Sequence, residues 1–179
     1  VKDSKYLPKW VGELYLEYHR GTYTTMGRNK RYNRKSEFLY QDTEFLSSLA
    51  MLLGQEYPQQ LINQGWETIL LNQFHDIIPG SSIWEVYEDS KKQYEEIIKV
   101  GTELTDKATE GIGAQIDLKE RSVVVYNTLA FNRDEIVTFE VPSDIQHPCI
   151  VDDKGQTLPC QLTEKDGKRY AVFSAQGLP

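Results

Sequence analysis

Apolar residues recur every three or four positions through the first two thirds of the chain, the spacing of amphipathic helices. Beyond Asp117 the pattern changes to β-branched alternation with frequent turn signals. The first region predicts three helices joined by short loops, which form an antiparallel bundle. The second predicts a partial antiparallel sheet, because about 60 residues rarely close a full sandwich. The expected fold class is therefore α+β.

Punctuating residues set the expected helix ends. Gly54 ends the first helix, Pro58 suits the first position of the second, and a Pro-Gly pair at 79–80 stops it. The third opens at Ser82, which forms a capping-box pattern with Glu85. The predicted helices cover about residues 28–53, 58–78 and 82–112.

The apolar stripe of each helix is expected to form the bundle core. Trp66, Trp84 and Tyr94 are included there, rather than read as carbohydrate-stacking platforms. The other expected core residues are Phe38, Leu39, Phe45, Leu46, Leu49, Leu52, Leu53, Ile62, Ile69, Leu70, Phe74, Ile77, Ile83, Tyr87, Ile97, Ile98, Leu104, Ala108 and Ile112.

Two strands and two hairpins are expected after residue 117. The segments 122–126 and 135–141 are rich in β-branched and aromatic residues, and the second alternates clearly. Asp-Asp-Lys-Gly at 152–155 and Lys-Asp-Gly-Lys at 165–168 supply residues that tolerate the positive φ of tight turns. A hairpin is predicted around each of them.

Composition narrows the class of partner. The net charge of −7 and the pI near 5.0 argue against nucleic acid, whose phosphates bind Lys and Arg. A basic run at 28–35 is therefore interpreted as a solvated helix face. No apolar run of about 18 residues is present, so no membrane partner is expected. A neutral or small polar ligand fits better.

The two cysteines, Cys149 and Cys160, are too few for a disulfide framework or a cysteine zinc module. We expect reduced, packed thiols, although a disulfide between them stays open. The chain begins without Met and ends after a strand-like run, so we expect part of a longer polypeptide.

His75 and Asp76 stand out near the predicted end of the second helix. Histidine is the commonest protein metal ligand, and a carboxylate beside it can contact the metal's surroundings or a substrate hydroxyl. Without further context the pair favours a helix-end histidine that interacts with the helix dipole, beside a solvated aspartate. The pair alone is therefore a weak indication of a metal site.

Three segments, in order, resemble the α-mannosidases of glycoside hydrolase family 38, particularly the cytosolic and bacterial branch. Residues 71–82, with Asn-Gln-Phe-His-Asp-Ile-Ile-Pro-Gly-Ser at 72–81, resemble the His-Asp segment of the family's middle helical domain. Residues 12–25 resemble its junction between catalytic barrel and bundle, and residues 123–133 the first strand of its C-terminal β region. The resemblance implies a junction at 1–26, a bundle at 27–116 and a β region from 117 to 179.

Family members are zinc-dependent retaining glycosidases, so the resemblance implies site roles. His75 matches a zinc ligand and Asp76 a carboxylate that binds sugar hydroxyls. The other ligands of the single Zn²⁺, the nucleophile and the acid/base belong to a barrel that this chain lacks, so no catalytic residue is assigned here. His19, Arg20 and Tyr23 match the junction that lines the sugar pocket, with surface packing as an equal alternative.

Glu13 and Glu17 are interpreted as structural. The leading hypothesis is a cytoplasmic exo-α-mannosidase in which this chain, inactive alone, partners the barrel of the same polypeptide and an α-mannoside. The alternative is a non-catalytic helical and β module that binds a protein or a glycan.

Overall fold

The computed structural model describes residues 9–12, 19–118 and 121–179. The chain divides into two compact units, one up to Ile116 and one from Asp117 to Pro179. Within the described part, no helix has both the length and the apolar character that a bilayer crossing requires. The predicted α+β fold class is confirmed, since the first unit is helical and the second is built of strands.

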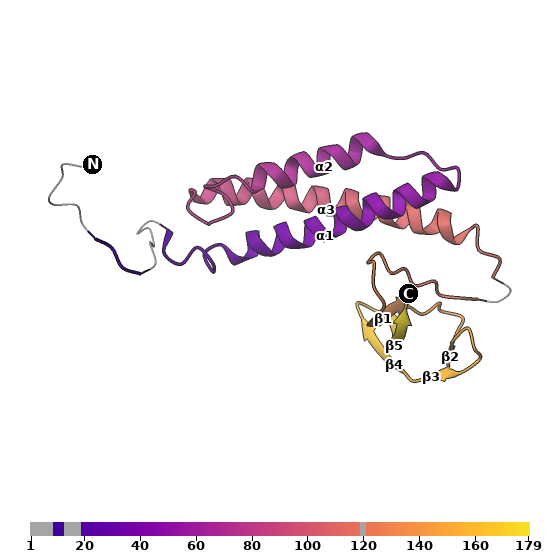
Figure 1. The fold of residues 1–179 in the computed structure, drawn as a ribbon. Helices are drawn as coiled ribbons and strands as arrows, with labels where there is room; N and C mark the ends of the chain where they lie inside the picture. The colour runs from indigo at the N-terminus through magenta and orange to yellow at the C-terminus, as the bar shows by residue number, and fades with distance from the viewer. Residues whose placement is uncertain (1–8, 13–18, 119–120) are drawn as a thin grey trace. The chain divides into compact units, whose positions relative to one another are not determined.

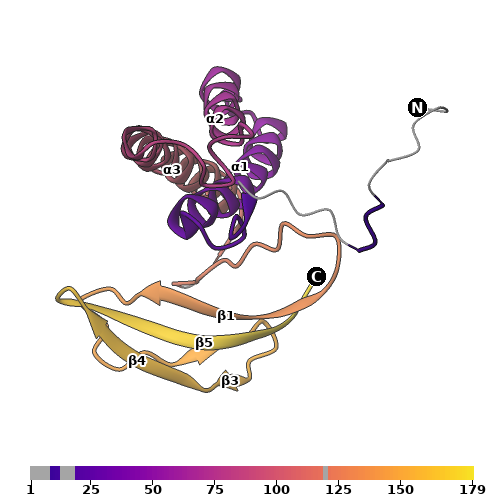
Figure 2. The same cartoon turned by 90° about the vertical axis from the view of Figure 1, so that its left-hand side faces the viewer.

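Three helices make the first unit: α1 (Gly27–Leu52), α2 (Gln59–Asn72) and α3 (Trp84–Gly113). Consecutive helices run in opposite directions, so the N-terminus of α1, the C-terminus of α2 and the N-terminus of α3 share one end (Figure 1). Seen almost along their axes, the helices surround a common centre (Figure 2). The predicted antiparallel bundle is confirmed.

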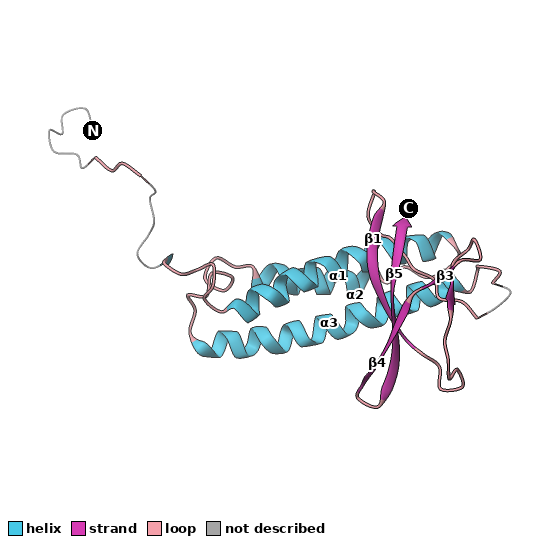
Figure 3. Cartoon of the chain, turned by 90° about the horizontal axis from the view of Figure 1, so that it is seen from below, coloured by secondary structure: helices cyan, strands magenta, loops and turns pink. Residues whose placement is uncertain are grey.

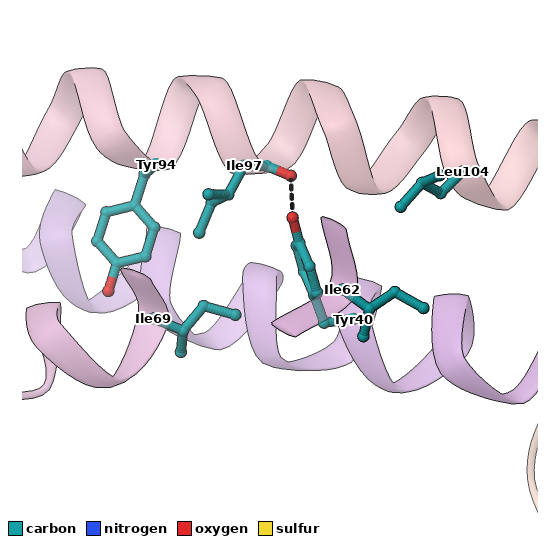
Figure 4. Close-up of a cluster of buried hydrophobic side chains, with 6 residues drawn as sticks. All are labelled: Tyr40, Ile62, Ile69, Tyr94, Ile97 and Leu104. Atoms are coloured by element: carbon teal, nitrogen blue, oxygen red, sulfur yellow. Dashed lines mark hydrogen bonds between the residues drawn. The ribbon is translucent and has the colours of Figure 1, made fainter. Parts of the chain in front are cut away.

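The bundle core joins side chains from all three helices (Figure 4). Tyr40 is fully buried, and its hydroxyl donates a hydrogen bond of 3.0 Å to the carbonyl of Ile97. Its ring passes over the α2 backbone, because a Cβ on Gly65 would lie 1.9 Å from Tyr40 Cε1. The remaining members of the central cluster are Ile62, Ile69, Tyr94 and Leu104.

The predicted apolar face of α1 is wrong. Phe38, Phe45 and Leu52 are 53%, 51% and 79% exposed, and only Leu46 of the predicted stripe is buried. The buried face is mainly small or polar, and hydrogen bonds to α3 satisfy several of its polar groups. Thr43 Oγ1, for example, lies 2.8 Å from Thr105 Oγ1. The buried residues are Asn29, Asn33, Ser36, Tyr40, Thr43, Leu46, Ser47 and Ala50.

Other predicted core positions near the ends of α2 and α3 are also wrong. Leu70 and Phe74 are 61% and 51% exposed, and Ile83 and Trp84 are 68% and 63% exposed. For Phe74 the cause is that α2 ends at Asn72 rather than at Pro79, so the helical periodicity does not extend to this position. Leu70 lies within α2 but on its exposed face. Turns closed by hydrogen bonds between residues three apart, such as Phe74 N–H to Leu71 O, replace the expected last helical turns of α2.

The second unit contains a three-stranded antiparallel sheet in the order β1 (Arg133–Glu140), β5 (Lys168–Leu178), β4 (Cys160–Lys165). Figure 3 shows the strands of this unit in magenta. A separate pair joins β2 (Ile150–Val151) to β3 (Thr157–Leu158), both labelled in Figure 1. Both predicted hairpins are therefore confirmed. Asp166 and Gly167, at φ 52° and 73°, form the tight turn between β4 and β5.

The strand predicted at residues 122–126 is wrong, because that segment pairs with no strand among the described residues. The sheet instead buries Ala171, Phe173 and Ala175 of β5, its central strand. Cys149 and Cys160 are both free, and Cys149 is exposed rather than packed as expected.

Candidate functional site

His75 and Asp76 lie at the end of the bundle where α2 finishes and α3 begins (Figure 1). They belong to a series of turns at residues 73–83, called the His75 turn below, and not to the helix end that the sequence predicted. The segment 19–26, which contains His19 and Tyr23, leads into α1 at the same end. The structure thus brings together the two parts of the chain that contain the predicted site residues.

Three consecutive backbone carbonyls hold the turn in place. The carbonyl of Asp76 accepts from Ser82 Oγ, that of Ile77 from the Tyr87 hydroxyl at 3.2 Å, and that of Ile78 from Lys30 Nζ at 2.8 Å. Carbonyls outside a regular helix need partners of this kind. Because the donors come from α1, α3 and the loop before α3, the backbone just after His75 is fixed from several sides.

Ser82 performs this role instead of the predicted capping role. Helix α3 begins at Trp84 with Ile83 at its N-cap, and no side chain caps it. The Ser82 amide donates to the Tyr87 hydroxyl at 3.1 Å, which draws Ser82 toward the turn. The capping-box prediction is therefore wrong, because the serine hydroxyl bonds to the Asp76 carbonyl in the preceding turn instead of to the first amides of the helix.

Lys30 is also placed differently from the expected solvated basic face. Its ammonium donates to Thr25 O at 2.6 Å and to Ile78 O at 2.8 Å, and burial lowers the pKa of Lys30. Beside it, Gly80 has φ 95°, and a Cβ there would lie 2.6 Å from Thr25 Cγ2. Segment 19–26 and the His75 turn are therefore in direct contact.

A polar network anchors the start of the turn to α1. Gln73 Nε2 donates to Asn33 Oδ1 at 3.0 Å and to Glu37 Oε1 at 2.8 Å. Asn33 Oδ1 also accepts from the Tyr94 hydroxyl at 3.3 Å. Burial, followed by the nearby Glu37 charge, raises the pKa of Tyr94, so the hydroxyl keeps its proton as a donor. Arg34 pairs with Glu37 at 2.6 Å.

The His75 and Asp76 side chains point outward from this rigid support. The side chains are 76% and 57% exposed, and Nε2 lies 3.4 Å from Asp76 Oδ2. The ring of Phe74 lies 4.1 Å from the imidazole, centroid to centroid. Because more than half of each side chain is exposed, both groups are available to a ligand.

These two groups fit part of a zinc site. Imidazole nitrogen and carboxylate oxygen are both donors that Zn²⁺ accepts, but the ion takes four ligands, or three and an open position. In the described ranges, no cluster of three or more His, Cys, Asp or Glu residues is present. Any metal bound at His75 therefore needs ligands from outside these ranges.

The junction residues differ in exposure. His19 is half-buried, and its carbonyl accepts from the Thr22 amide at 3.3 Å, whereas Tyr23 is 85% exposed and Arg20 is also exposed. Their pocket roles stay predictions. Glu13 and Glu17 lie outside the described residues.

Several supports of the site were missed by sequence reasoning. Lys30, Gln73 and Tyr87 hold the turn through partners in other elements, and local patterns do not reveal such contacts. The exposed side chains of Phe74, Ile83 and Trp84 near the turn were assigned to the core. Helical spacing alone was misleading there.

Comparison with known proteins identifies the family. A family model described as the alpha mannosidase middle domain matches residues 17–112. The chain belongs to this family of α-mannosidase middle domains. The predicted resemblance to glycoside hydrolase family 38 α-mannosidases is thereby confirmed.

Curated relatives are named as α-mannosidases. The chain is 39% identical over 143 residues to alpha-mannosidase 2C1 of Mus musculus, covering 79% of this chain and 14% of that protein. It is 37% identical over 138 residues to an alpha-mannosidase of Saccharomyces cerevisiae, covering 75% of this chain and 12% of that protein. The chain thus spans about one seventh of the length of these relatives.

Solved structures share the fold. An alpha-mannosidase from Enterococcus faecalis V583 matches 87% of this chain and 22% of its own, with a TM-score of 0.68 and 21% identity. A second Enterococcus faecalis structure, described as a protein of glycosyl hydrolase family 38, matches 88% of this chain and 23% of its own at 23% identity, with the same TM-score. At these identities, the likeness concerns the fold alone.

Proposed function

We propose that the full-length protein containing this chain is a zinc-dependent exo-α-mannosidase that hydrolyses terminal α-mannosides with retention of configuration. The observation that carries the proposal is the exposed His75–Asp76 pair, held on a turn whose next three carbonyls are each bonded by a side chain. The pair lies within a middle domain whose curated relatives are named α-mannosidases.

In this proposal His75 supplies one imidazole ligand to Zn²⁺, and the remaining ligands come from the rest of the polypeptide. The bound metal orients and polarises the hydroxyl groups of the sugar. Asp76 accepts hydrogen bonds from sugar hydroxyls, for which its exposed carboxylate has free lone pairs. His19 and Tyr23 line the same pocket, where the exposed Tyr23 ring offers a stacking surface.

The bond-breaking groups lie outside this chain in the proposed enzyme. Retaining glycosidases use two carboxyl groups about 5 Å apart, one as nucleophile and one as acid/base. His75 and Asp76 instead bind and orient the sugar from the bundle side. The 179-residue chain alone is therefore proposed to be inactive. A cytoplasmic location is part of the same proposal and fits the two free cysteines.

The test uses three variants of the full-length protein, with a chromogenic α-mannoside as substrate. His75→Ala is expected to lose most bound zinc and turnover, and Asp76→Asn to keep the zinc while KM rises. His147→Ala is the matched control, because His147 is exposed and lies in the second unit. Zinc content is measured alongside activity with and without chelator.

Three outcomes oppose the proposal. Wild-type zinc content and activity in His75→Ala refutes the ligand role. Full activity of the wild type after complete removal of metal refutes zinc dependence. An inverted product anomer, read by NMR during turnover, refutes retention.

A further inference from the structure

We propose that Lys30 is a positioning residue that locks the junction segment 19–26 to the His75–Asp76 turn, and so sets the spacing of the sugar-binding groups on the two segments. The inference rests on the proposed function, since it concerns the same pocket. It assigns a role in substrate binding to a lysine that contacts neither metal nor sugar in the proposed mechanism.

The geometry of the ammonium group carries the argument. Lys30 Nζ donates to two backbone carbonyls, Thr25 O at 2.6 Å and Ile78 O at 2.8 Å, and these belong to different segments. Hydrogen bonds from an ionised donor are shorter and stronger than neutral ones. One side chain on helix α1 therefore fixes the end of the junction segment and the middle of the 73–83 turn together.

The backbone around Lys30 leaves little room for another arrangement. Gly80 approaches Thr25 so closely that a Cβ would lie 3.0 Å from Thr25 O and 2.6 Å from Thr25 Cγ2. The Thr25 hydroxyl in turn donates to Gly21 O at 2.7 Å, which continues the ordered turn toward Tyr23. Displacing Lys30 thus releases a contact that reaches both groups of site residues.

Lysine suits this position because its compact ammonium carries three donors on a flexible stem. Methionine has a similar length and no donor, so Lys30→Met removes the two bonds while conserving most of the volume. Lys30→Arg keeps charge and donors on a larger, planar group. Lys35→Met is the matched control, since it removes the same charge from an exposed position of the same helix.

The experiment compares these variants in the full-length protein by hydrogen exchange and by steady-state kinetics. Lys30→Met is expected to speed amide exchange in peptides from 19–26 and from 73–83, and to leave exchange in α2 unchanged. For a chromogenic α-mannoside, kcat/KM should fall at least about tenfold, because small displacements of binding groups have large kinetic effects. The fall should lie mainly in KM, with zinc content retained.

Lys30→Arg is expected to recover part of the lost kcat/KM, and Lys35→Met to match the wild type. The inference is overturned if Lys30→Met has the kinetics and the amide exchange of the wild type. It is also overturned if Lys35→Met changes both by as much as Lys30→Met does. If Lys30→Met does not fold, Lys30→Arg becomes the deciding variant. A wild-type KM in Lys30→Arg, together with faster amide exchange in only one of the segments 19–26 and 73–83, contradicts a lock between these segments. An inactive wild type, by contrast, refutes the proposed function and leaves the exchange result as the test of the lock.

Discussion

Replacing Gly65 by alanine should disrupt the bundle core more than either of two other glycine replacements. A Cβ at Gly65 would lie 1.9 Å from Tyr40 Cε1 and 2.3 Å from the Tyr40 hydroxyl oxygen, and the ring has no free space because Tyr40 is fully buried. At Gly101 the nearest atom is Leu39 Cδ2, at 2.9 Å. At Gly111 it is the terminal amide of Gln55, a flexible group that can move aside.

The expected magnitude for Gly65→Ala combines three effects. Overpacking costs about 1–3 kcal/mol, and displacement of the Tyr40 ring loses the hydrogen bond to Ile97 O, about 1 kcal/mol. Alanine regains about 1 kcal/mol of helix propensity. The net destabilisation is therefore about 1–3 kcal/mol. The destabilisation caused by Gly101→Ala should be smaller than that caused by Gly65→Ala. Gly111→Ala should stabilise the bundle by up to about 1 kcal/mol.

Urea unfolding followed by tryptophan fluorescence measures these differences in the bundle alone. All three tryptophans precede Asp117, and Trp66 packs edge-on against Tyr40 with a centroid distance of 5.9 Å. Its emission therefore reports the environment that the replacement disturbs. If Gly65→Ala unfolds at or above the wild-type urea midpoint, or if Gly111→Ala loses as much stability, the packing argument fails.

Two further predictions concern titration and turn geometry. Burial, with a smaller contribution from Glu96, raises the pKa of Tyr40 to about 12, so the native state holds this proton more tightly. Its contribution, on the order of 2 kcal/mol, should be present below pH 10 and lost as pH rises toward 12, and the urea midpoint should fall less steeply in Tyr40→Phe. In the β4–β5 turn, Gly167→Ala should cost about 1 kcal/mol because φ is 73°, whereas Asp166→Gly should be tolerated. Hydrogen exchange of peptides from 160–178 measures the effect of both turn substitutions. Equal protection in Gly167→Ala and in the wild type contradicts the turn argument.

The residues of the candidate site could be predicted from the sequence, but the contacts that hold them in place could not. The His75–Asp76 pair and its neighbours stand out in the sequence because they resemble a family segment. Their supports do not, since Lys30 contacts Ile78 from 48 residues away, and Gln73 contacts Glu37 from 36 residues away. Contacts over such separations depend on how the helices align. Local composition contains no record of that alignment.

The sequence by itself determined the order of the three helices, their packing as a bundle, and both hairpins. These follow from hydrophobic periodicity, proline and glycine stops and Asp-Gly turns, which act within a few residues. Only the tertiary structure decided which face of α1 is buried. There the small and polar residues face the core and Phe38, Phe45 and Leu52 face outward, because buried hydrogen bonds to α3 compensate for several of the polar groups. Just after the end of α2 at Asn72, the Gln73 side chain bonds to Asn33 and Glu37, which are distant in sequence. The Ser82 hydroxyl bonds to the Asp76 carbonyl in the preceding turn instead of capping α3, a competition that helix-capping patterns do not reveal.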